Sequence, residues 1–512
     1  MEHLHPARSL FLFLIEAKLS RAQARRGAAL PCFFLAGGAK TRYNEEKFRC
    51  GAMRHGLRGG PDMKKLTARQ YAALASMLFG MFFGAGNLIF PVYMGQLAGS
   101  RSPAAIAGFL VTGVGLPLLG IVALGVSRSS GLLEMASRVS RGYGLAFTCA
   151  LYLTIGPLFA IPRTATVSFS VSAEAVAGTD ERGLLIFSAV FFAAVLFFSL
   201  RPSGILTWIG KIINPLFLVF LGILVAAALA RPMASAGAIA PQGTYENAAF
   251  FTGFLEGYNT MDLLASLAFG IVVVNVVRGL GVEEPRGVAA AAVRSGVFSM
   301  ALMAAIYAAI TVVGAQSRGQ FDVAENGGVA LTLIAKYYFG AAGGLLLAGA
   351  VIFACLKTAI GLVTSCGEMF SELFPRSMPY RGWAVLFSAV SFLIANFGLN
   401  AILEWSLPVL RLLYPLSIVL ILLNTFGGAF GYAKCVFAWT TWCTFPAALI
   451  DFAAALPAGV REALNLTPLV QAAERWLPLF DAGLGWVSPA VFGFAIGVFV
   501  YAFGRTRESE ST

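Results

Sequence analysis

The pattern of hydrophobic and polar positions along the chain is a series of long apolar stretches separated by short polar segments. Most stretches approach or exceed the roughly 20 apolar residues that a helix needs to cross a bilayer. The sequence therefore predicts an all-α polytopic membrane protein. We expect twelve membrane-spanning helices, at about residues 71–98, 104–126, 145–177, 183–200, 206–230, 250–277, 291–315, 341–373, 383–398, 401–426, 435–456 and 487–504.

The first stretch is interrupted by the run Phe-Gly-Ala-Gly-Asn-Leu-Ile-Phe-Pro at residues 83–91. Glycine lowers helix propensity by about 1 kcal/mol relative to alanine, and asparagine is also a poor helix former. A broken helix is tolerated inside a bilayer only where the freed backbone groups line a cavity or are otherwise buried in protein. Close packing of two helices is the alternative explanation for glycine in such a span. The Gly-Ala-Gly-Asn sequence followed by Pro91 favours a binding site.

The sixth stretch contains a second interruption, Glu-Gly-Tyr-Asn-Thr-Met-Asp at residues 256–262. The last residue, Asp262, lies at membrane depth, where a charge costs about 2.5–3.5 kcal/mol on insertion scales. The two breaks are five spans apart, and an odd number places the second set of helices in the opposite orientation. This spacing predicts an inverted repeat of residues 71–230 and 250–426, followed by two extra helices within 435–504, with a site at the midplane.

The chemistry expected at such a site follows from the ends of the broken helices. A half-helix N-terminus exposes N–H groups and a partial positive charge, which suits a carboxylate. Carbonyl groups freed by the break suit a cation such as Na⁺.

Composition agrees with a membrane protein and removes other classes. The 512 residues are 58% hydrophobic and 12% charged, with a mean hydropathy of +0.78, whereas soluble domains are about 25% charged. The net charge of +12 is not accompanied by a basic motif with interleaved aromatic residues, so we expect no nucleic-acid partner. The seven cysteines lack metal-ligand spacing, and all three histidines precede the first span. A buried histidine-based metal or catalytic site is therefore excluded.

Residues 1–62 differ from the rest, with eleven Lys/Arg, five Asp/Glu and only one short apolar run. The sequence at residues 63–67, Met-Lys-Lys-Leu-Thr, is typical of a bacterial start. We expect 1–62 to be a disordered or non-native extension that transport does not need, and 63–512 to be the transporter domain. With the N-terminus inside, fifteen Lys/Arg fall in inner loops and seven in outer loops, which predicts that both termini are cytoplasmic.

Several motifs together resemble the branched-chain amino acid carrier family, the bacterial LIV-II or BrnQ-type cation symporters of the amino acid–polyamine–organocation superfamily. The resemblance runs from about Met63 to the C-terminus and rests on residues 83–91, 156–169, 257–262, 269–275 and 358–362. It implies a leucine-transporter-like fold and Na⁺-coupled uptake of leucine, isoleucine and valine across the bacterial inner membrane. It implies no enzyme activity, no cofactor beyond the coupling ion and no obligate protein partner; lipid is the only other contact expected.

The resemblance also implies site residues. Backbone groups of Gly84, Ala85 and Gly86, with the Asn87 amide, would meet the substrate carboxylate and a neighbouring ion. The second break would receive the amino group through its carbonyls and the Tyr258 ring; its residues are Gly257, Tyr258, Asn259 and Thr260.

A second ion would lie between the first break and the eighth span. Its ligands would be the Gly80 and Phe83 carbonyls and the Thr358 hydroxyl. The apolar substrate pocket is less defined by the sequence. Phe159, Phe254 and Met261 are candidates to line it, although packing in the core is the commoner role of such residues.

Three positions depart from the family pattern. Lys357 stands where a small or apolar residue is expected. Ser170 stands in the place of a glutamate, with Glu174 one turn later. Arg411 lies in the tenth span, where a neutral residue is expected. Lys357 could occupy the second ion site, which would make transport proton-coupled or uncoupled. Otherwise it snorkels or pairs with a carboxylate such as Glu368 or Glu174. Snorkelling or pairing is also expected of Arg411, and Arg163 could pair with Glu174.

Two other classes of function remain as alternatives. A channel would need a filter or charged rings, and a membrane enzyme would need acid, base or metal groups gathered at one face. The sequence shows neither pattern.

Overall fold

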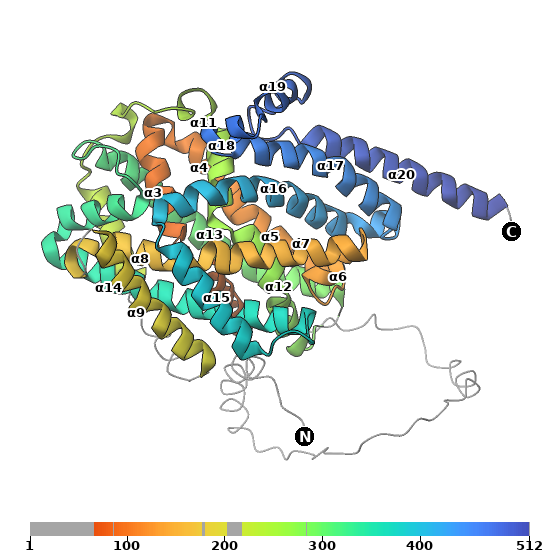
Figure 1. The fold of residues 1–512 in the computed structure, drawn as a ribbon, viewed down its shortest axis with the longest axis horizontal. Coiled ribbons are helices and arrows are strands. Elements are labelled where there is room, and N and C mark those ends of the chain that lie inside the picture. Colours follow the sequence, from red (N-terminus) through yellow and green to blue (C-terminus); the bar gives the residue numbers. More distant parts are fainter. Residues whose placement is uncertain (1–65, 85, 177–179, 202–217, 283, 511–512) are drawn as a thin grey trace, which may run out of the picture. The chain divides into compact units, whose positions relative to one another are not determined.

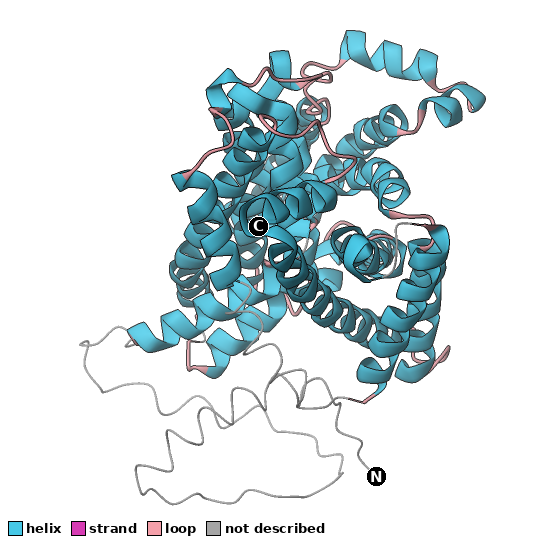
Figure 2. Cartoon of the chain, turned by 90° about the vertical axis from the view of Figure 1, so that its left-hand side faces the viewer, coloured by secondary structure: helices cyan, strands magenta, loops and turns pink. Residues whose placement is uncertain are grey.

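The computed structural model describes residues 66–84, 86–176, 180–201, 218–282 and 284–510. These segments form helices and connecting loops, with no strand among them (Figures 1 and 2). The expectation for residues 1–62 and the part of the predicted span 206–230 up to residue 217 fall outside the described residues. The rest of that span is the helix Leu218–Ala230.

The first predicted repeat corresponds to these elements: α2 (Ala68–Phe82), α3 (Gly86–Ala98), η1 (Gly99–Arg101), α4 (Ser102–Leu110), η2 (Val111–Gly115), α5 (Leu116–Val126), α6 (Leu132–Ser137), α7 (Arg141–Leu153), η3 (Thr154–Leu158), α8 (Ala160–Val176) and α9 (Glu181–Leu200). The second corresponds to η4 (Ala236–Ala238), α11 (Tyr245–Glu256), η5 (Gly257–Thr260), α12 (Asp262–Gly279), α13 (Pro285–Ser317), α14 (Gly327–Leu373), α15 (Tyr380–Ala395) and α16 (Leu399–Phe426). The C-terminal elements are η6 (Gly427–Phe430), α17 (Lys434–Ala455), α18 (Ala458–Ala463), α19 (Thr467–Trp476) and α20 (Val487–Glu510).

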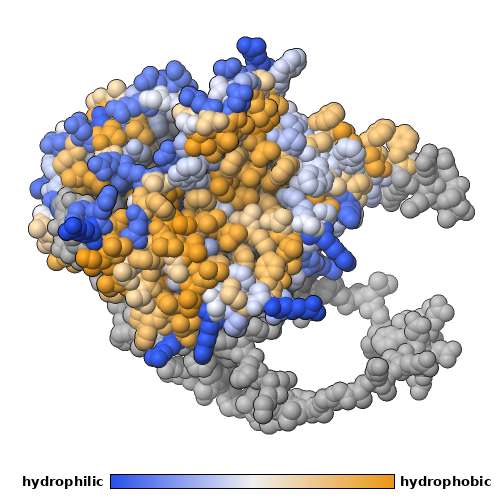
Figure 3. Space-filling view, in the orientation of Figure 1, coloured by the Kyte–Doolittle hydropathy of each residue, from blue (hydrophilic) through white to orange (hydrophobic). Residues whose placement is uncertain are grey.

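Eight helical stretches in the described segments are long and apolar enough to cross a membrane, and three shorter apolar helices accompany them. Large apolar side chains are exposed on helices from all parts of the chain, among them Phe197, Phe298, Leu393 and Phe499. Figure 3 shows apolar side chains covering much of the face that includes α15. An exposed apolar surface of this kind suits contact with lipid, because lipid removes the cost of leaving it in water.

The most closely packed helix pairs bring distant segments together: α8 lies against α14, α3 against α13, and α17 beside α20 (Figure 1). Glycines allow the backbones of α3 and α13 to touch. A Cβ built on Gly95 would overlap the Thr311 carbonyl oxygen, and one on Gly314 would overlap the Val92 carbonyl oxygen. This contact fixes the second half of the first span against the seventh.

The observed helices differ from the predicted spans in three places. The span predicted at 341–373 begins at Gly327 and bends at Gly340, whose φ of 63° is left-handed. The span predicted at 145–177 contains the π-turn η3 with a non-helical Gly156, because Pro157 cannot donate a helix hydrogen bond. Two short helices, α18 and α19, occupy the loop between α17 and α20, where no helix was predicted.

Candidate functional site

The first break lies between α2 and α3, as the sequence predicts. A capping box at Thr67 begins α2, and Phe83 ends it with an extended backbone (φ −77°, ψ 106°). The Gly84 N–H donates to Asn87 Oδ1 at 3.1 Å instead of continuing the helix toward the Gly80 carbonyl. The last turn of α2 therefore ends with carbonyls that lack helical donors. Ala85 lies outside the described residues.

The second break is the turn η5 between α11 and α12. It ends at Met261, whose φ of 59° is left-handed, a conformation that costs a non-glycine residue about 1–3 kcal/mol and is often found at functional sites. The Thr260 hydroxyl donates to the Gly257 carbonyl at 2.9 Å and accepts the Asp262 N–H at 3.3 Å. A Cβ on Gly257 would overlap Thr112 Oγ1, so glycine is needed for the turn to pack against η2.

A buried polar cluster joins the two breaks. Asn87 Nδ2 donates to Asp262 Oδ2 at 2.7 Å and also to the Tyr307 hydroxyl, and the Tyr307 hydroxyl lies 3.5 Å from Asp262 Oδ2. The three side chains are 1–3% exposed. We call Asn87, Asp262 and Tyr307 the junction cluster. Its hydrogen bonds offset part of the cost of burying a carboxylate.

Arg163, on α8, touches both breaks. Its Nη1 donates to the Asn259 carbonyl at 2.7 Å, and its Nη2 lies 3.3 Å from the point where a Cβ on Gly86 would stand. The guanidinium carbon is 5.1 Å from the centre of the Phe90 ring. The side chain is 6% exposed. The side chain of Glu174, its expected partner, lies outside the described residues.

Two stacked tyrosines cover the second break. The rings of Tyr258 and Tyr414 lie 3.9 Å apart at 19°, and neither hydroxyl has a hydrogen-bond partner among the described residues. Asn259 Nδ2 donates to Glu256 Oε2 at 2.9 Å. Arg411 lies close enough to Glu256 and Asp451 for their charges to attract one another. Arg411 makes no ion pair with either carboxylate among the described residues, so snorkelling and pairing both remain as interpretations of this side chain.

Of the residues expected to form a second ion site, the structure places Thr358 beside the first break. Thr358 Oγ1 is 3.8 Å from the Cβ position of Gly84 and donates to the Ala354 carbonyl at 3.0 Å. The space around the Cβ position of Gly80 is open to 4 Å. In the described residues no three His, Cys, Asp or Glu side chains gather to hold a metal, so an ion here would rely on carbonyl and hydroxyl oxygens.

Lys357 is half-buried on α14, and the residues one turn away on either side, Phe353 and Gly361, are exposed. No described carboxylate, Glu368 included, lies within ion-pair distance of it. The expected pocket residues lie near the second break or the core: Phe254 packs on Tyr258 at 5.7 Å, Met261 is buried and Phe159 is half-buried.

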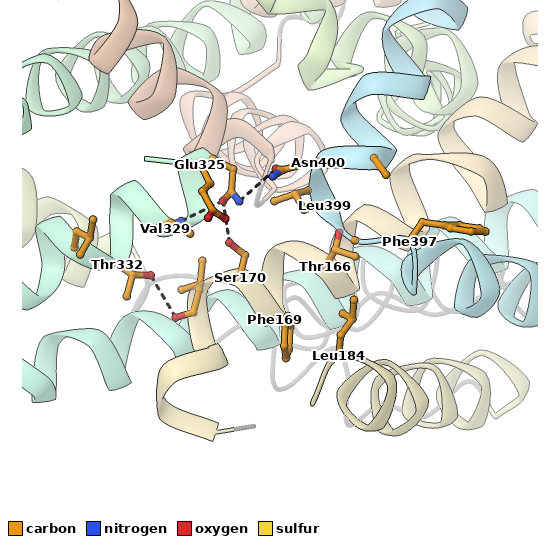
Figure 4. A pocket seen from close by; sticks show the side chains of 15 residues that line it. Thr166, Phe169, Ser170, Leu184, Glu325, Val329, Thr332, Phe397, Leu399 and Asn400 are labelled. Atoms are coloured by element: carbon orange, nitrogen blue, oxygen red, sulfur yellow. Dashed lines mark hydrogen bonds between the residues drawn. The ribbon is translucent and has the colours of Figure 1, made fainter. Parts of the chain in front are cut away.

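A cavity of about 340 Å³ lies farther along α8, where α9, α14 and α16 begin (Figure 4). Ser170 donates to Asn326 Oδ1 at 2.9 Å, and Asn326 Nδ2 lies 3.4 Å from Asn400 Oδ1. Ser170, the position that departs from the family pattern, thus contributes to this cavity. Ser170 lies seven positions, or about two helical turns, after Arg163 on α8.

Sequence reasoning placed both breaks but missed Tyr307 and gave Asp262 and Arg163 no defined role in the site. The available signal for Tyr307 was its position as the one tyrosine in the apolar run 291–315. Hydropathy alone cannot show which side of α13 faces the site.

An all-helical membrane domain with two spans broken around one buried polar cluster has the architecture of a secondary transporter. The family model described as branched-chain amino acid transport protein matches residues 67–503, and the chain belongs to this family. Its similar curated relatives are permeases and carriers, not enzymes.

Three relatives show how far the likeness extends. The chain is 49% identical over 436 residues to the branched-chain amino acid permease BrnQ of Lactobacillus delbrueckii subsp. lactis, covering 85% of this chain and 97% of the relative. It is 40% identical over 449 residues to BrnQ of Bacillus subtilis, and the match covers 87% of this chain and 100% of that relative. It is 39% identical over 451 residues to the branched-chain amino acid transport system 2 carrier protein of Pseudomonas aeruginosa, covering 87% and 100%.

Two solved structures share the fold. The inward-facing conformation of Mhp1 matches with a TM-score of 0.56 at 14% identity, covering 85% of this chain and 91% of Mhp1. MhsT in complex with L-phenylalanine matches with a TM-score of 0.50 at 14% identity, and the match covers 85% of this chain and 98% of MhsT. These likenesses confirm the leucine-transporter-like fold.

Proposed function

We propose that this protein is a symporter of the bacterial inner membrane that takes up leucine, isoleucine and valine with Na⁺ by alternating access, with both termini in the cytoplasm. The observation that carries the proposal is the Asn87–Asp262 hydrogen bond, which joins the two helix breaks at one place. The relatives' names, branched-chain amino acid permease and carrier, supply the substrate class.

The substrate lies between the breaks in this proposal. Its carboxylate meets the N-terminus of α3, at Gly84 to Asn87, where N–H groups and the helix dipole favour an anion. Its amino group meets the second break, at Gly257 to Thr260, beneath the Tyr258 ring. The apolar side chain of the substrate packs against the surrounding hydrophobic residues, an environment that suits a branched aliphatic group.

In this proposal the coupling ion binds at the C-terminal end of α2. Its oxygen ligands come from Gly80, Phe83 and Thr358, and the Asn87 amide lies nearby. Support comes from the Gly84 N–H, which bonds to Asn87 and leaves the Gly80 carbonyl without its helical donor. Freed carbonyls of broken helices are the ligands that transporters of this architecture use for Na⁺.

A proton-coupled mechanism is the second candidate. Lys357 neighbours Thr358 and lacks a described carboxylate partner, so its ammonium is free to take the place of Na⁺. In that version the lysine supplies the positive charge, and transport follows a pH gradient or is uncoupled.

Labelled leucine uptake into proteoliposomes tests both candidates. The proposal predicts accumulation above the external concentration under an inward Na⁺ gradient, and its loss when a large organic cation replaces Na⁺. Uptake that ignores Na⁺, follows a pH gradient and regains Na⁺ dependence in Lys357→Val would support the second candidate instead. Lys434→Val, at an exposed lysine that begins α17, is the matched control and leaves coupling unchanged. A channel or an enzyme would not accumulate leucine against its gradient.

A further inference from the structure

We infer that Arg163 recognises the substrate carboxylate directly and thereby sets the requirement for an amino acid rather than an amine. The inference rests on the proposed function, because it names a residue and a chemical group for that same site. Arg163 was not among the site residues expected from the sequence.

The guanidinium is held in place at the meeting point of the breaks. Its Nη1 is anchored on the Asn259 carbonyl of the second break. Its Nη2 points at Gly86, the first residue of α3, and donates to no described atom. Because Gly86 has no side chain, Nη2 comes close to the backbone at the start of α3; a Cβ there would stand only 3.3 Å from Nη2 and 3.5 Å from the Phe90 ring. A carboxylate bound beside Gly86 would therefore meet the helix N–H groups and Nη2 together.

The balance of charge favours this role. Branched-chain amino acids have apolar side chains, so the carboxylate and the ammonium are their only charged groups. Taking a carboxylate out of water costs several kcal/mol unless it is paired and hydrogen-bonded, and a helix N-terminus supplies only about half an elementary charge. An arginine supplies a full charge and a planar fork of donors that matches a carboxylate.

A second unpartnered group lies at the same place. Tyr414 is 0% exposed, and its hydroxyl has no hydrogen-bond partner among the described residues. It lies within electrostatic range of both Arg163 and Asp262. Buried hydroxyls are normally hydrogen-bonded, and this hydroxyl and the nearby Leu263 backbone add polar groups to the surroundings of Arg163.

The test measures binding of L-leucine and of isoamylamine, which is leucine without its carboxylate, to purified protein. Wild type should bind leucine more tightly. In Arg163→Gln, leucine affinity should fall about tenfold or more, the range expected for losing a hydrogen bond to a charged group, while isoamylamine affinity stays unchanged. Arg163→Lys keeps the charge and should retain part of the preference for leucine, which covers the case in which Arg163→Gln does not fold.

Arg138→Gln is the matched control. Arg138 also donates to a side chain, Asn424 Oδ1, and to a backbone carbonyl, that of Ser127, both at 2.7 Å. These contacts lie at the C-terminal ends of α16 and α5. Arg138→Gln should leave both affinities unchanged. Unchanged leucine affinity in Arg163→Gln, or equal losses for both ligands in Arg163→Gln and Arg163→Lys, would overturn the inference. Failure of wild type to accumulate leucine despite binding it would instead overturn the proposed function.

Discussion

The Asn87 carboxamide uses both of its ends to organise the site. Its oxygen accepts the Gly84 N–H and so replaces the bond that would have continued α2. Its nitrogen donates to Asp262 and Tyr307 and so links the first break to the second and to α13. A single residue thus both ends a helix and sets where the two halves of the chain meet.

Replacing Asn87 with alanine should therefore raise the leucine concentration for half-maximal uptake by about tenfold, since hydrogen bonds to charged groups are worth about 1.5–3 kcal/mol. Initial rates measured against leucine and Na⁺ concentration check this. Asn424→Ala is the control: Asn424 is also buried, but it bonds Arg138 and should leave the half-saturation unchanged. Unaltered kinetics with less folded Asn87→Ala protein would make Asn87 purely structural.

At this scale the sequence could show Gly84, Gly86 and Asn87, because a glycine or asparagine inside an apolar run is a local signal. It could not show that Asn87 contacts Tyr307, 220 residues away, or that Arg163 reaches Asn259, 96 residues away. Such contacts depend on how helices rotate against one another, which hydropathy does not encode.

Among the elements, one glycine inside α3 and one just before it have different roles. At Gly95 the backbone of α13 occupies the space that a Cβ would need. At Gly84, just before α3, a Cβ would meet only ordinary contacts, Asn87 Oδ1 at 3.7 Å and Thr358 Oγ1 at 3.8 Å. The first glycine serves helix packing and the second leaves room in the site.

Gly95→Ala should therefore destabilise the protein by about 1–3 kcal/mol, the usual cost of overpacking, whereas Gly84→Ala should not. Thermal unfolding in detergent, followed for both variants and wild type, checks this. Gly314→Ala, on the facing side of the same contact, should behave like Gly95→Ala. Equal unfolding temperatures for Gly95→Ala and Gly84→Ala would contradict the distinction.

The sequence predicted the long apolar helices and both breaks well, since length and hydropathy define spans directly. It missed the part of α14 before Gly340 and the short helices α18 and α19. Short helices are only marginally stable alone and form through packing of one face. In α19 that face includes Val470 and Ala473, which pack with Ala453 of α17. Single-sequence hydropathy does not contain this information.

Across the whole molecule, two breaks in spans five apart meet at one buried place. The odd spacing inverts the second set of helices, which lets equivalent breaks face each other. This relation, visible in the sequence, accounts for the position of the site. The family match over residues 67–503 and the fold of Mhp1 and MhsT agree with it.

The central claim is that the meeting point of the two breaks is the transport site. Leucine accumulation in proteoliposomes that hold equal amounts of folded wild type or Gly86→Leu tests it most directly. A leucine side chain at residue 86 would fill the space facing Arg163 Nη2. Wild type should accumulate leucine under an inward Na⁺ gradient, whereas Gly86→Leu should insert normally but neither bind nor accumulate it. Accumulation by Gly86→Leu at the wild-type level would show that substrate does not bind where the two breaks meet.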